Sequence, residues 1–154
     1  MLEETIMVIL ANISPALEQI GGIPLGLALG LDPVYVLLLS LIVNCLLFFP
    51  IYFGLKIFYK RIFSNIKFFN RQLERIRREG RPYIVKYGIF GLTLFISLPT
   101  PLTGTYTASI LSWFLDLDWK RSFIAIAIGS TIGGMIILST SLGLIEALKI
   151  IFSV

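Results

Sequence analysis

Residues 34–55 have the sequence VYVLLLSLIVNCLLFFPIYFGL, a run of 22 residues without an Asp, Glu, Lys or Arg. As an α-helix, this run would reach roughly 32 Å, enough to cross the hydrocarbon core of a bilayer, which is about 30 Å thick. A second uncharged run covers residues 122–142. Only 14% of the 154 residues are charged, whereas soluble domains carry about 25%. The sequence therefore predicts an all-α integral membrane protein with a single membrane domain.

Basic residues are concentrated in one loop. Ten of the thirteen Lys and Arg residues lie between Lys56 and Lys86, and the positive-inside rule places such a loop in the cytoplasm. Residues 34–55 would then run from outside to inside, and Lys120 and Arg121 would return the chain to the cytoplasmic face. We expect a multi-pass protein of the cell membrane whose basic loop, residues 56–86, is cytoplasmic.

Residues 83–115 leave and re-enter the cytoplasmic face with only 33 residues, which Pro99, Pro101 and Gly104 interrupt. Helices over residues 83–98 and 105–115 would reach roughly 24 and 17 Å, less than a full membrane crossing. The segment is therefore expected to form a re-entrant hairpin that enters from the cytoplasm.

Residues 1–31 have the same organisation. An apolar segment ends at Ser14, a second one ends at Leu31, and between them lie Pro15, Glu18, Gly21, Gly22 and Pro24. The prediction is a re-entrant hairpin that enters from outside. The alternative is one kinked spanning helix over residues 5–31.

Both halves share one order of elements: short helix, Pro/Gly break, short return helix, acidic corner and uncharged span. This order is typical of an inverted-topology repeat, in which the interrupted segments mark a site near the membrane midplane. We assign repeat one to residues 1–57 and repeat two to residues 82–154, with a basic amphipathic linker over residues 58–81.

Apolar residues at helical spacing in this linker predict a helix over residues 61–80 that lies on anionic lipids of the inner leaflet. The alternative is a cytoplasmic helix that packs against a second chain. A homo-oligomer is compatible with the sequence, and nucleic acid is not expected as a partner.

The breaks are the predicted site. Lipid cannot satisfy unpaired backbone amides, so an interrupted chain at membrane depth should line a hydrated cavity. Pro24 suits the first position of a return helix, and Thr103 could cap another that begins near Thr105. Helix N-termini favour anions. The predicted substrate and proton site comprises Glu18, Gly21, Gly22, Pro24, Pro99, Pro101, Thr103, Gly104, Thr105, Thr107 and Asn44, where Asn44 either lines the cavity or bonds a neighbouring helix.

Glu18 is the only acid expected far from an interface. Burying an ionised carboxylate in a membrane is costly unless it is paired or hydrated. A residue that takes up and releases a proton is therefore our functional interpretation. The alternatives are that Glu18 only accepts hydrogen bonds from unpaired amides of the break, or that it lies nearer the outer interface.

Other features limit the chemistry. The chain has no His and one Cys, Cys45, so neither a metal site nor another cofactor is expected. No nucleophile, base and orienting group can be assembled, so we do not expect an enzyme. Gly129 and Gly133 allow close helix contact, and packing within the chain is favoured over dimerisation.

The segments PALEQIGGIPLGLALGL (15–31) and LPTPLTGTYTASIL (98–111) resemble motifs of the small multidrug export proteins, which are related to the DedA and VTT-domain membrane proteins. This resemblance covers most of the chain. It implies two opposed re-entrant loops and an important acid at Glu18. The chain departs from the relatives at Gln19-Ile20, where Leu-Arg is frequent, and by the absence of Arg from residues 87–119.

Three functions are compatible with these observations. The first is a proton-coupled transporter or lipid translocase that moves a lipid-phosphate or other amphiphilic substrate, as the resemblance to the wider superfamily implies. The second is a proton-coupled exporter of small hydrophobic cations, for which Glu18 would be the counter-charge. The third is a structural or assembly subunit of the membrane that transports nothing.

Overall fold

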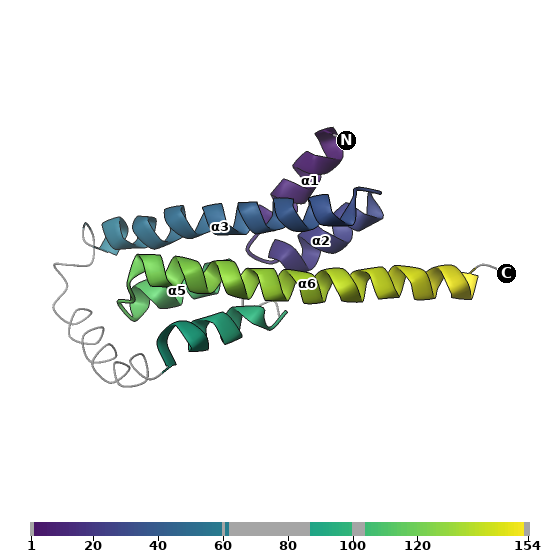
Figure 1. The fold of residues 1–154 in the computed structure, drawn as a ribbon. Helices are drawn as coiled ribbons and strands as arrows, with labels where there is room; N and C mark the ends of the chain where they lie inside the picture. Colours follow the sequence, from purple (N-terminus) through teal and green to yellow (C-terminus); the bar gives the residue numbers. More distant parts are fainter. Residues whose placement is uncertain (1, 60, 62–86, 100–103, 153–154) are drawn as a thin grey trace.

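The computed structural model describes residues 2–59, 61, 87–99 and 104–152, and the regular structure within them is helical (Figure 1). The helices are α1 (Leu2–Ile13), α2 (Glu18–Ala28), α3 (Pro33–Phe58), a helix over Tyr87–Ser97, α5 (Thr105–Phe114) and α6 (Trp119–Phe152). Helix α3 and residues Trp119–Ala147 of α6 are long and apolar enough to cross a membrane. The prediction of an all-α membrane protein is confirmed at this level.

Helix α3 begins where the sequence provides a cap. The Asp32 carboxylate accepts a hydrogen bond from the Tyr35 amide at 3.0 Å, and Pro33 occupies the first helical turn, where its missing N–H costs nothing. Before this cap, α2 ends in a left-handed residue, Gly30, and the Leu31 amide donates back to the Gly26 carbonyl. This is the helix ending that glycine favours.

The corner between α5 and α6 repeats this pattern. Asp116 takes the left-handed conformation in place of glycine, and the Leu117 amide donates to the Ser112 carbonyl. Leu31 and Leu117 lie 86 positions apart, as do their acceptors Gly26 and Ser112. The two corners are therefore built alike, each from one left-handed residue, one Leu and one Asp.

Helices α1 and α2 fold back on each other. A Cβ added to Gly22 would collide with the Asn12 side chain, and one added to Gly26 would lie 3.1 Å from a methyl group of Val8. Residues of α1 thus meet residues of α2 in reverse order, as in an antiparallel hairpin. The single kinked helix considered for residues 5–31 is not what the structure contains, since residues 14–17 separate two packed helices.

In each half, the first short helix runs in the same direction as the long one. Thr5 near the start of α1 bonds Tyr35 near the start of α3, and Asn12 near the end of α1 bonds Ser40, further along α3. Helices α1 and α3 therefore run in the same direction. In the second half, Gly129 of α6 lies against the Thr93 carbonyl, and the Ile96 and Ser97 carbonyls lie beside Gly133. The expectation that Gly129 and Gly133 serve packing within the chain is therefore confirmed.

Helices α3 and α6 are antiparallel neighbours (Figure 1). Phe49 and Phe53 near the end of α3 contact Trp119 at the start of α6, while Leu37 near the start of α3 lies against Gly134. A core of aromatic and aliphatic side chains around Phe48 fills one end of the bundle. A smaller core around Val8, Ile23 and Val36 fills the other.

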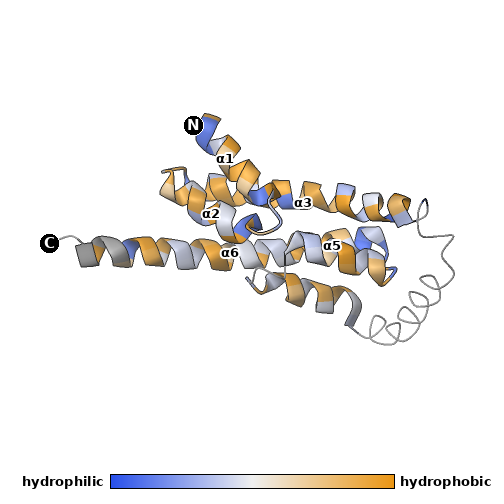
Figure 2. Ribbon diagram, turned by 180° about the vertical axis from the view of Figure 1, so that it is seen from behind, coloured by the Kyte–Doolittle hydropathy of each residue, from blue (hydrophilic) through white to orange (hydrophobic). Residues whose placement is uncertain are grey.

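The outer surface of the bundle is apolar. Leu38, Ile42 and Leu46 are each more than half exposed and recur every four residues along one face of α3. Figure 2 shows hydrophobic residues over most of α3, with hydrophilic residues near the α1–α2 connection, inside the bundle. Such a surface is compatible with lipid and not with water.

One sequence expectation is wrong. Helix α2 begins at Glu18, so Pro24 is an interior residue of the helix and not its first. Two adjacent glycines and a proline usually interrupt a helix, but here the small surface of Gly22 lets Asn12 approach closely. Packing in the hairpin therefore outweighs local propensity.

Some predictions fall outside the described residues. These are the amphipathic helix expected over residues 61–80, except for Arg61, and the site residues Pro101 and Thr103.

Candidate functional site

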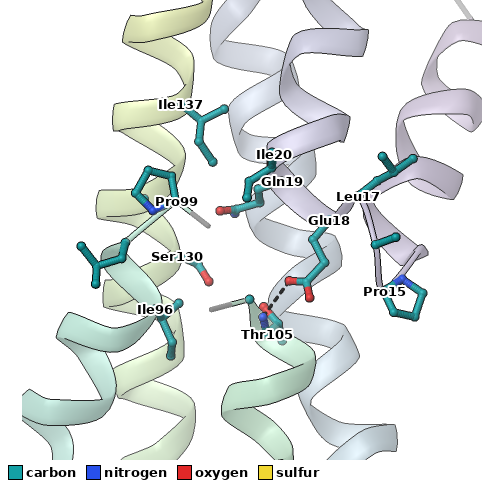
Figure 3. Close-up of a pocket in the computed structure, with 14 residues that line it drawn as sticks. Pro15, Leu17, Glu18, Gln19, Ile20, Ile96, Pro99, Thr105, Ser130 and Ile137 are labelled. Carbon is teal, nitrogen blue, oxygen red and sulfur yellow. Dashed lines mark hydrogen bonds between the residues drawn. The ribbon is translucent and has the colours of Figure 1, made fainter. Parts of the chain in front are cut away.

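The two breaks in the chain meet at one cleft in the middle of the bundle (Figure 3). Its walls come from the α1–α2 connection and the start of α2, from the end of the Tyr87–Ser97 helix, from the start of α5 and from α6. We call it the central cleft, lined by residues 15–20, 96, 98, 99, 104, 105, 130, 133 and 137. Segments more than 80 positions apart in sequence are thus brought together.

Glu18 connects the two halves of the chain across this cleft. Its carboxylate accepts a hydrogen bond from the Thr105 amide at 2.7 Å, and its other oxygen lies 3.5 Å from the Tyr106 amide. Both amides belong to the first turn of α5, which has no side-chain cap of its own. Amides of the first helical turn have no partner within the helix. Glu18 therefore caps a helix of the opposite half.

The backbone around Glu18 is adapted to this contact. Glu18 has a φ of 42°, a left-handed conformation that costs a residue with a side chain roughly 1–3 kcal/mol. Opposite it, a Cβ added to Gly104 would collide with the Glu18 carboxylate. Only glycine leaves room for the carboxylate to reach the start of α5.

Two further polar side chains line the central cleft, and no hydrogen bond of the Gln19 amide nitrogen or the Ser130 hydroxyl is found among the described residues. The Gln19 side chain is 8% exposed, and its amide nitrogen has no hydrogen bond. Ser130 is 2% exposed, and no hydrogen bond of its hydroxyl is found in the described part of the chain. Figure 3 shows Gln19 of α2 and Ser130 of α6 on either side of the cleft, beside Glu18.

The central cleft has room for water but not for an organic molecule. Its volume is ≈ 30 Å³, and one water requires about 10–15 Å³ by this measure. About two waters could therefore reach Glu18, Gln19 and Ser130 together. A hydrogen-bonded water can accept a proton from the carboxyl group and donate another, so the cleft has room for proton transfer to or from Glu18.

Asn44 belongs to a separate buried cluster. Its amide nitrogen donates to the Asn12 side chain at 3.3 Å and to the Ser40 carbonyl at 2.9 Å, and Asn12 in turn donates to the Ser40 hydroxyl. All three side chains are fully buried. Asn44 thus bonds a neighbouring helix, which was one of the two interpretations of this residue, and it does not line the central cleft.

The predicted site residues divide into three groups. Glu18, Pro99, Gly104 and Thr105 line the central cleft. Gly21, Gly22, Pro24, Asn44 and Thr107 do not, and Thr107 lies on an exposed face of α5. Pro101 and Thr103 lie outside the described residues.

Sequence reasoning missed Gln19, Ser130, Asn12 and Ser40. A signal was present for Asn12, because an Asn inside an apolar run usually needs a partner in a neighbouring helix. Ser130 carried less signal, since serine in a transmembrane helix normally bonds its own backbone.

The anion-binding amides at the start of α5 are occupied by the Glu18 carboxylate. The start of α5 was expected to receive an anionic group, and the anion that it receives here is the Glu18 carboxylate. A substrate phosphate would need the same amides, and it would be repelled by the carboxylate while Glu18 is ionised.

A family model described as "Putative small multi-drug export protein" matches residues 18–136. This match begins at Glu18, the first residue of α2, and continues into α6, so it includes the second break of the chain but not residues 14–17 of the first. No curated protein and no solved structure matches the chain.

Proposed function

Because the chain belongs to the small multi-drug export protein family, whose model covers most of it, we propose that it is a proton-coupled exporter of small hydrophobic cations. Glu18 takes up and releases the proton. The observation that carries this proposal is the position of Glu18, a buried carboxylate that caps α5 at a cleft with room for water.

The coupling follows from the two states of this carboxylate. An ionised Glu18 makes a charge-assisted hydrogen bond to the Thr105 amide and interacts favourably with the helix dipole of α5. A protonated Glu18 loses most of this attraction, so the two halves of the bundle separate more easily. Because the central cleft is too small for a drug-sized cation, the substrate passes only when the halves have separated. Proton binding and substrate movement are thereby linked.

Two opposed halves in the membrane are part of the proposal. What supports it is the direction of the helices: in each half a short helix runs alongside the long one, and the long helices α3 and α6 are antiparallel. With 12 and 11 residues, α1 and α2 are too short to cross the core, which takes about 20 residues. They form a re-entrant hairpin that enters opposite to the one made by the Tyr87–Ser97 helix and α5.

The basic end of the bundle faces the cytoplasm in this proposal. Lys56 at the end of α3 and Lys120 and Arg121 at the start of α6 share one end of the bundle, because Phe53 contacts Trp119. Glu3, Glu4 and Asp32 share the other end, since α1 runs alongside α3. Asp116 and Asp118, just before α6, also lie at the basic end, but the positive-inside rule counts Lys and Arg and gives acids little weight. The position of the three basic residues therefore agrees with the rule.

The lipid-phosphate substrate favoured from sequence has less support. It needs the amides of α5 that Glu18 occupies, and residues 87–119 contain no Arg to neutralise a phosphate. A relation to the DedA and VTT-domain proteins, a homo-oligomer and the absence of enzymatic activity stay predictions from the sequence.

The test uses the purified protein in liposomes with an acidic lumen. Wild-type protein should accumulate ethidium from the outside while protons leave, and Glu18→Gln should reduce uptake to the level of empty liposomes. Glu146→Gln, an exposed carboxylate near the far end of α6, is the matched control and should behave as the wild type. Unchanged uptake by Glu18→Gln would contradict the proposal, and movement of labelled phospholipid without ethidium uptake would favour the lipid function instead.

A further inference from the structure

A second contact joins the two halves of the chain beside Glu18. The hydroxyl of Tyr106, in the first turn of α5, donates a hydrogen bond to the Ile13 carbonyl at 2.5 Å. Ile13 is the last residue of α1, so its carbonyl is one of those that have no partner within the helix. Tyr106 therefore caps the end of a helix of the opposite half, as Glu18 caps the start of α5.

The two caps are reciprocal, and they hold one short segment between them. The Tyr106 amide lies 3.5 Å from the Glu18 carboxylate, and the hydroxyl of the same residue bonds Ile13. Residues 14–17, which connect α1 to α2, lie between these two points. Most of this connection lines the central cleft. One residue of α5 thus contacts both ends of the connection and holds it against the start of α5.

The Ile13 carbonyl has no substitute for this donor. The last turn of α1 contains no basic residue, and within the described part of the chain no second donor to this carbonyl is found. Ile13 is 41% exposed, so the bundle does not cover the end of α1. Since lipid cannot donate a hydrogen bond, a carbonyl at membrane depth needs a donor from the protein. Loss of the Tyr106 hydroxyl should therefore weaken the contact between the halves.

The two caps respond differently to protons. Glu18 loses most of its attraction to the α5 amides when it is protonated, whereas a phenol keeps its proton over the pH range in which a carboxyl group titrates. Glu18 and Tyr106 are the titratable groups of this junction. From α1, α3, α6 and the Tyr87–Ser97 helix, no described titratable side chain lines the central cleft, and residues 99–104 contain none.

We infer that Tyr106 is a positioning residue for Glu18, and that its hydroxyl holds the two halves together whether or not Glu18 carries a proton. The contact keeps the central cleft closed until Glu18 is protonated, so it sets the pH at which the halves separate. This inference rests on the proposed function and deepens it, because it gives the closed state one contact that a proton weakens and one that it leaves intact.

The first test measures the opening of the central cleft without transport. Ser130 is 2% exposed and lines this cleft, so Ser130→Cys in a Cys45→Ser background should react with a water-soluble maleimide only when the cleft opens. One hydrogen bond changes such an equilibrium about threefold to tenfold. In detergent at a fixed pH, adding Tyr106→Phe should therefore raise the labelling rate about threefold to tenfold.

Tyr35→Phe is the matched control. The Tyr35 hydroxyl makes a hydrogen bond to the Thr5 hydroxyl at 3.2 Å, and both residues belong to the same half. Each variant loses one phenolic hydroxyl and keeps its ring, so both should fold, with similar thermal unfolding in detergent. Tyr35→Phe should leave the labelling rate unchanged. Equal acceleration by the two substitutions would show that Tyr106 has no particular role between the halves.

The second test is the pH dependence of ethidium uptake by liposomes, at a constant pH difference across the membrane. One pH unit changes the ratio of protonated to ionised carboxyl groups tenfold. Because protonation promotes separation, halves that separate about threefold to tenfold more easily need fewer protonated carboxyl groups. The midpoint of uptake in Tyr106→Phe should therefore lie about 0.5–1 pH unit higher than in the wild type, and that of Tyr35→Phe should not move. A slower uptake with an unchanged midpoint would show that Tyr106 does not set this pH.

The two measurements distinguish failure of this inference from failure of the proposed function. Unchanged labelling in Tyr106→Phe would overturn the inference, while ethidium uptake that still depends on Glu18 would leave the proposed function standing. If labelling is faster in Tyr106→Phe but uptake persists in Glu18→Gln, Tyr106 holds the halves together and the proton-coupled function is wrong.

Discussion

Glu18 is held between two groups that leave it little freedom. On one side its backbone takes a left-handed conformation, and on the other its carboxylate fits against Gly104 and the Thr105 amide. The strain at the backbone is offset by the bonds that the carboxylate makes, so the position of the side chain depends on both halves of the chain. A small change at Gly104 should therefore act like a change at Glu18 itself.

Gly104→Ala tests this dependence without altering any titratable group. The new Cβ would overlap the Glu18 carboxylate, and the start of α5 cannot yield without moving its amides. We expect the carboxylate to leave the α5 amides, which lowers the free energy of unfolding by roughly 1–3 kcal/mol and abolishes proton-driven ethidium uptake. Thermal unfolding in detergent and liposome uptake measure the two effects.

The matched control is Gly54→Ala, because a Cβ at Gly54 of α3 meets nothing within 4 Å. It should leave uptake as in the wild type and raise the free energy of unfolding by up to about 1 kcal/mol through helix propensity, the opposite sign to Gly104→Ala. Full uptake in Gly104→Ala would mean that the contact between Glu18 and α5 does not contribute to transport.

The sequence identified the acid and the helix start of this site, but not their relation. Glu18 and Thr105 were both expected at the site, since a lone acid and a Pro/Gly break are visible in the sequence. That Glu18 caps α5 depends on a contact between positions 87 residues apart, which local patterns do not encode. Gln19 and Ser130 were missed for the same reason. They matter because they line the cleft without a hydrogen-bond partner among the described residues, and this can be seen only in the folded structure.

At the scale of elements, the contact between α6 and the Tyr87–Ser97 helix depends on glycine. A Cβ at Gly129 would lie 2.8 Å from both the Thr93 carbonyl oxygen and the Ile96 Cβ. These are backbone and near-backbone atoms, so no rotation of a side chain can relieve the overlap. The two helices would have to move apart.

Gly129→Ala should therefore lower the free energy of unfolding by roughly 1–3 kcal/mol. Gly143→Ala is the control on the same helix, where a Cβ meets nothing within 4 Å. There alanine should raise stability by up to about 1 kcal/mol through helix propensity. Thermal unfolding of both variants in detergent gives the comparison, and equal values would show that the close approach is not needed.

The helix starts predicted from the sequence agree with the structure where capping residues are present. Asp32 and Pro33 locate the start of α3 to within one residue of the expected position. The start of α2 was placed six residues too late, because Gly21, Gly22 and Pro24 are poor helix formers by local propensity. The hairpin stabilises them through Gly22 and Gly26, whose small surfaces admit Asn12 and Val8. Tertiary packing of this kind is invisible until the partner helix is known.

At the scale of the whole molecule, the two corners suggest how the halves correspond. Their hydrogen bonds recur at an interval of 86 positions, and the same interval pairs Glu18 with Gly104 and Asn44 with Ser130. If the halves are the repeat predicted from the sequence, equivalent positions carry different residues: one half supplies the carboxylate, and the other supplies the glycine and amides that receive it. Such complementary pairs would need unlike residues, and the two copies would then share a pattern but little identity.

The opposed insertion of the two halves can be tested in whole cells and inverted vesicles. Single cysteines are placed in a Cys45→Ser background at Ala16 in the first break and at Pro99 in the second, both of which are exposed. Two further cysteines at Gly30 and Asp118 mark the two corners. Each variant is labelled from either side with a maleimide that does not cross membranes.

If the halves enter from opposite faces, the cysteines at positions 16 and 30 should react from outside and those at 99 and 118 from inside. The reason is that a short hairpin returns to the face from which it came, so each break is reached by water through its own half. Were α1 and α2 to cross the membrane as separate spans, position 16 would react from the face opposite to position 30. That single result would contradict the proposal that the central cleft lies inside the membrane. Glu18 would then lie among lipid head groups, and its protonation could not be coupled to movement of the two halves.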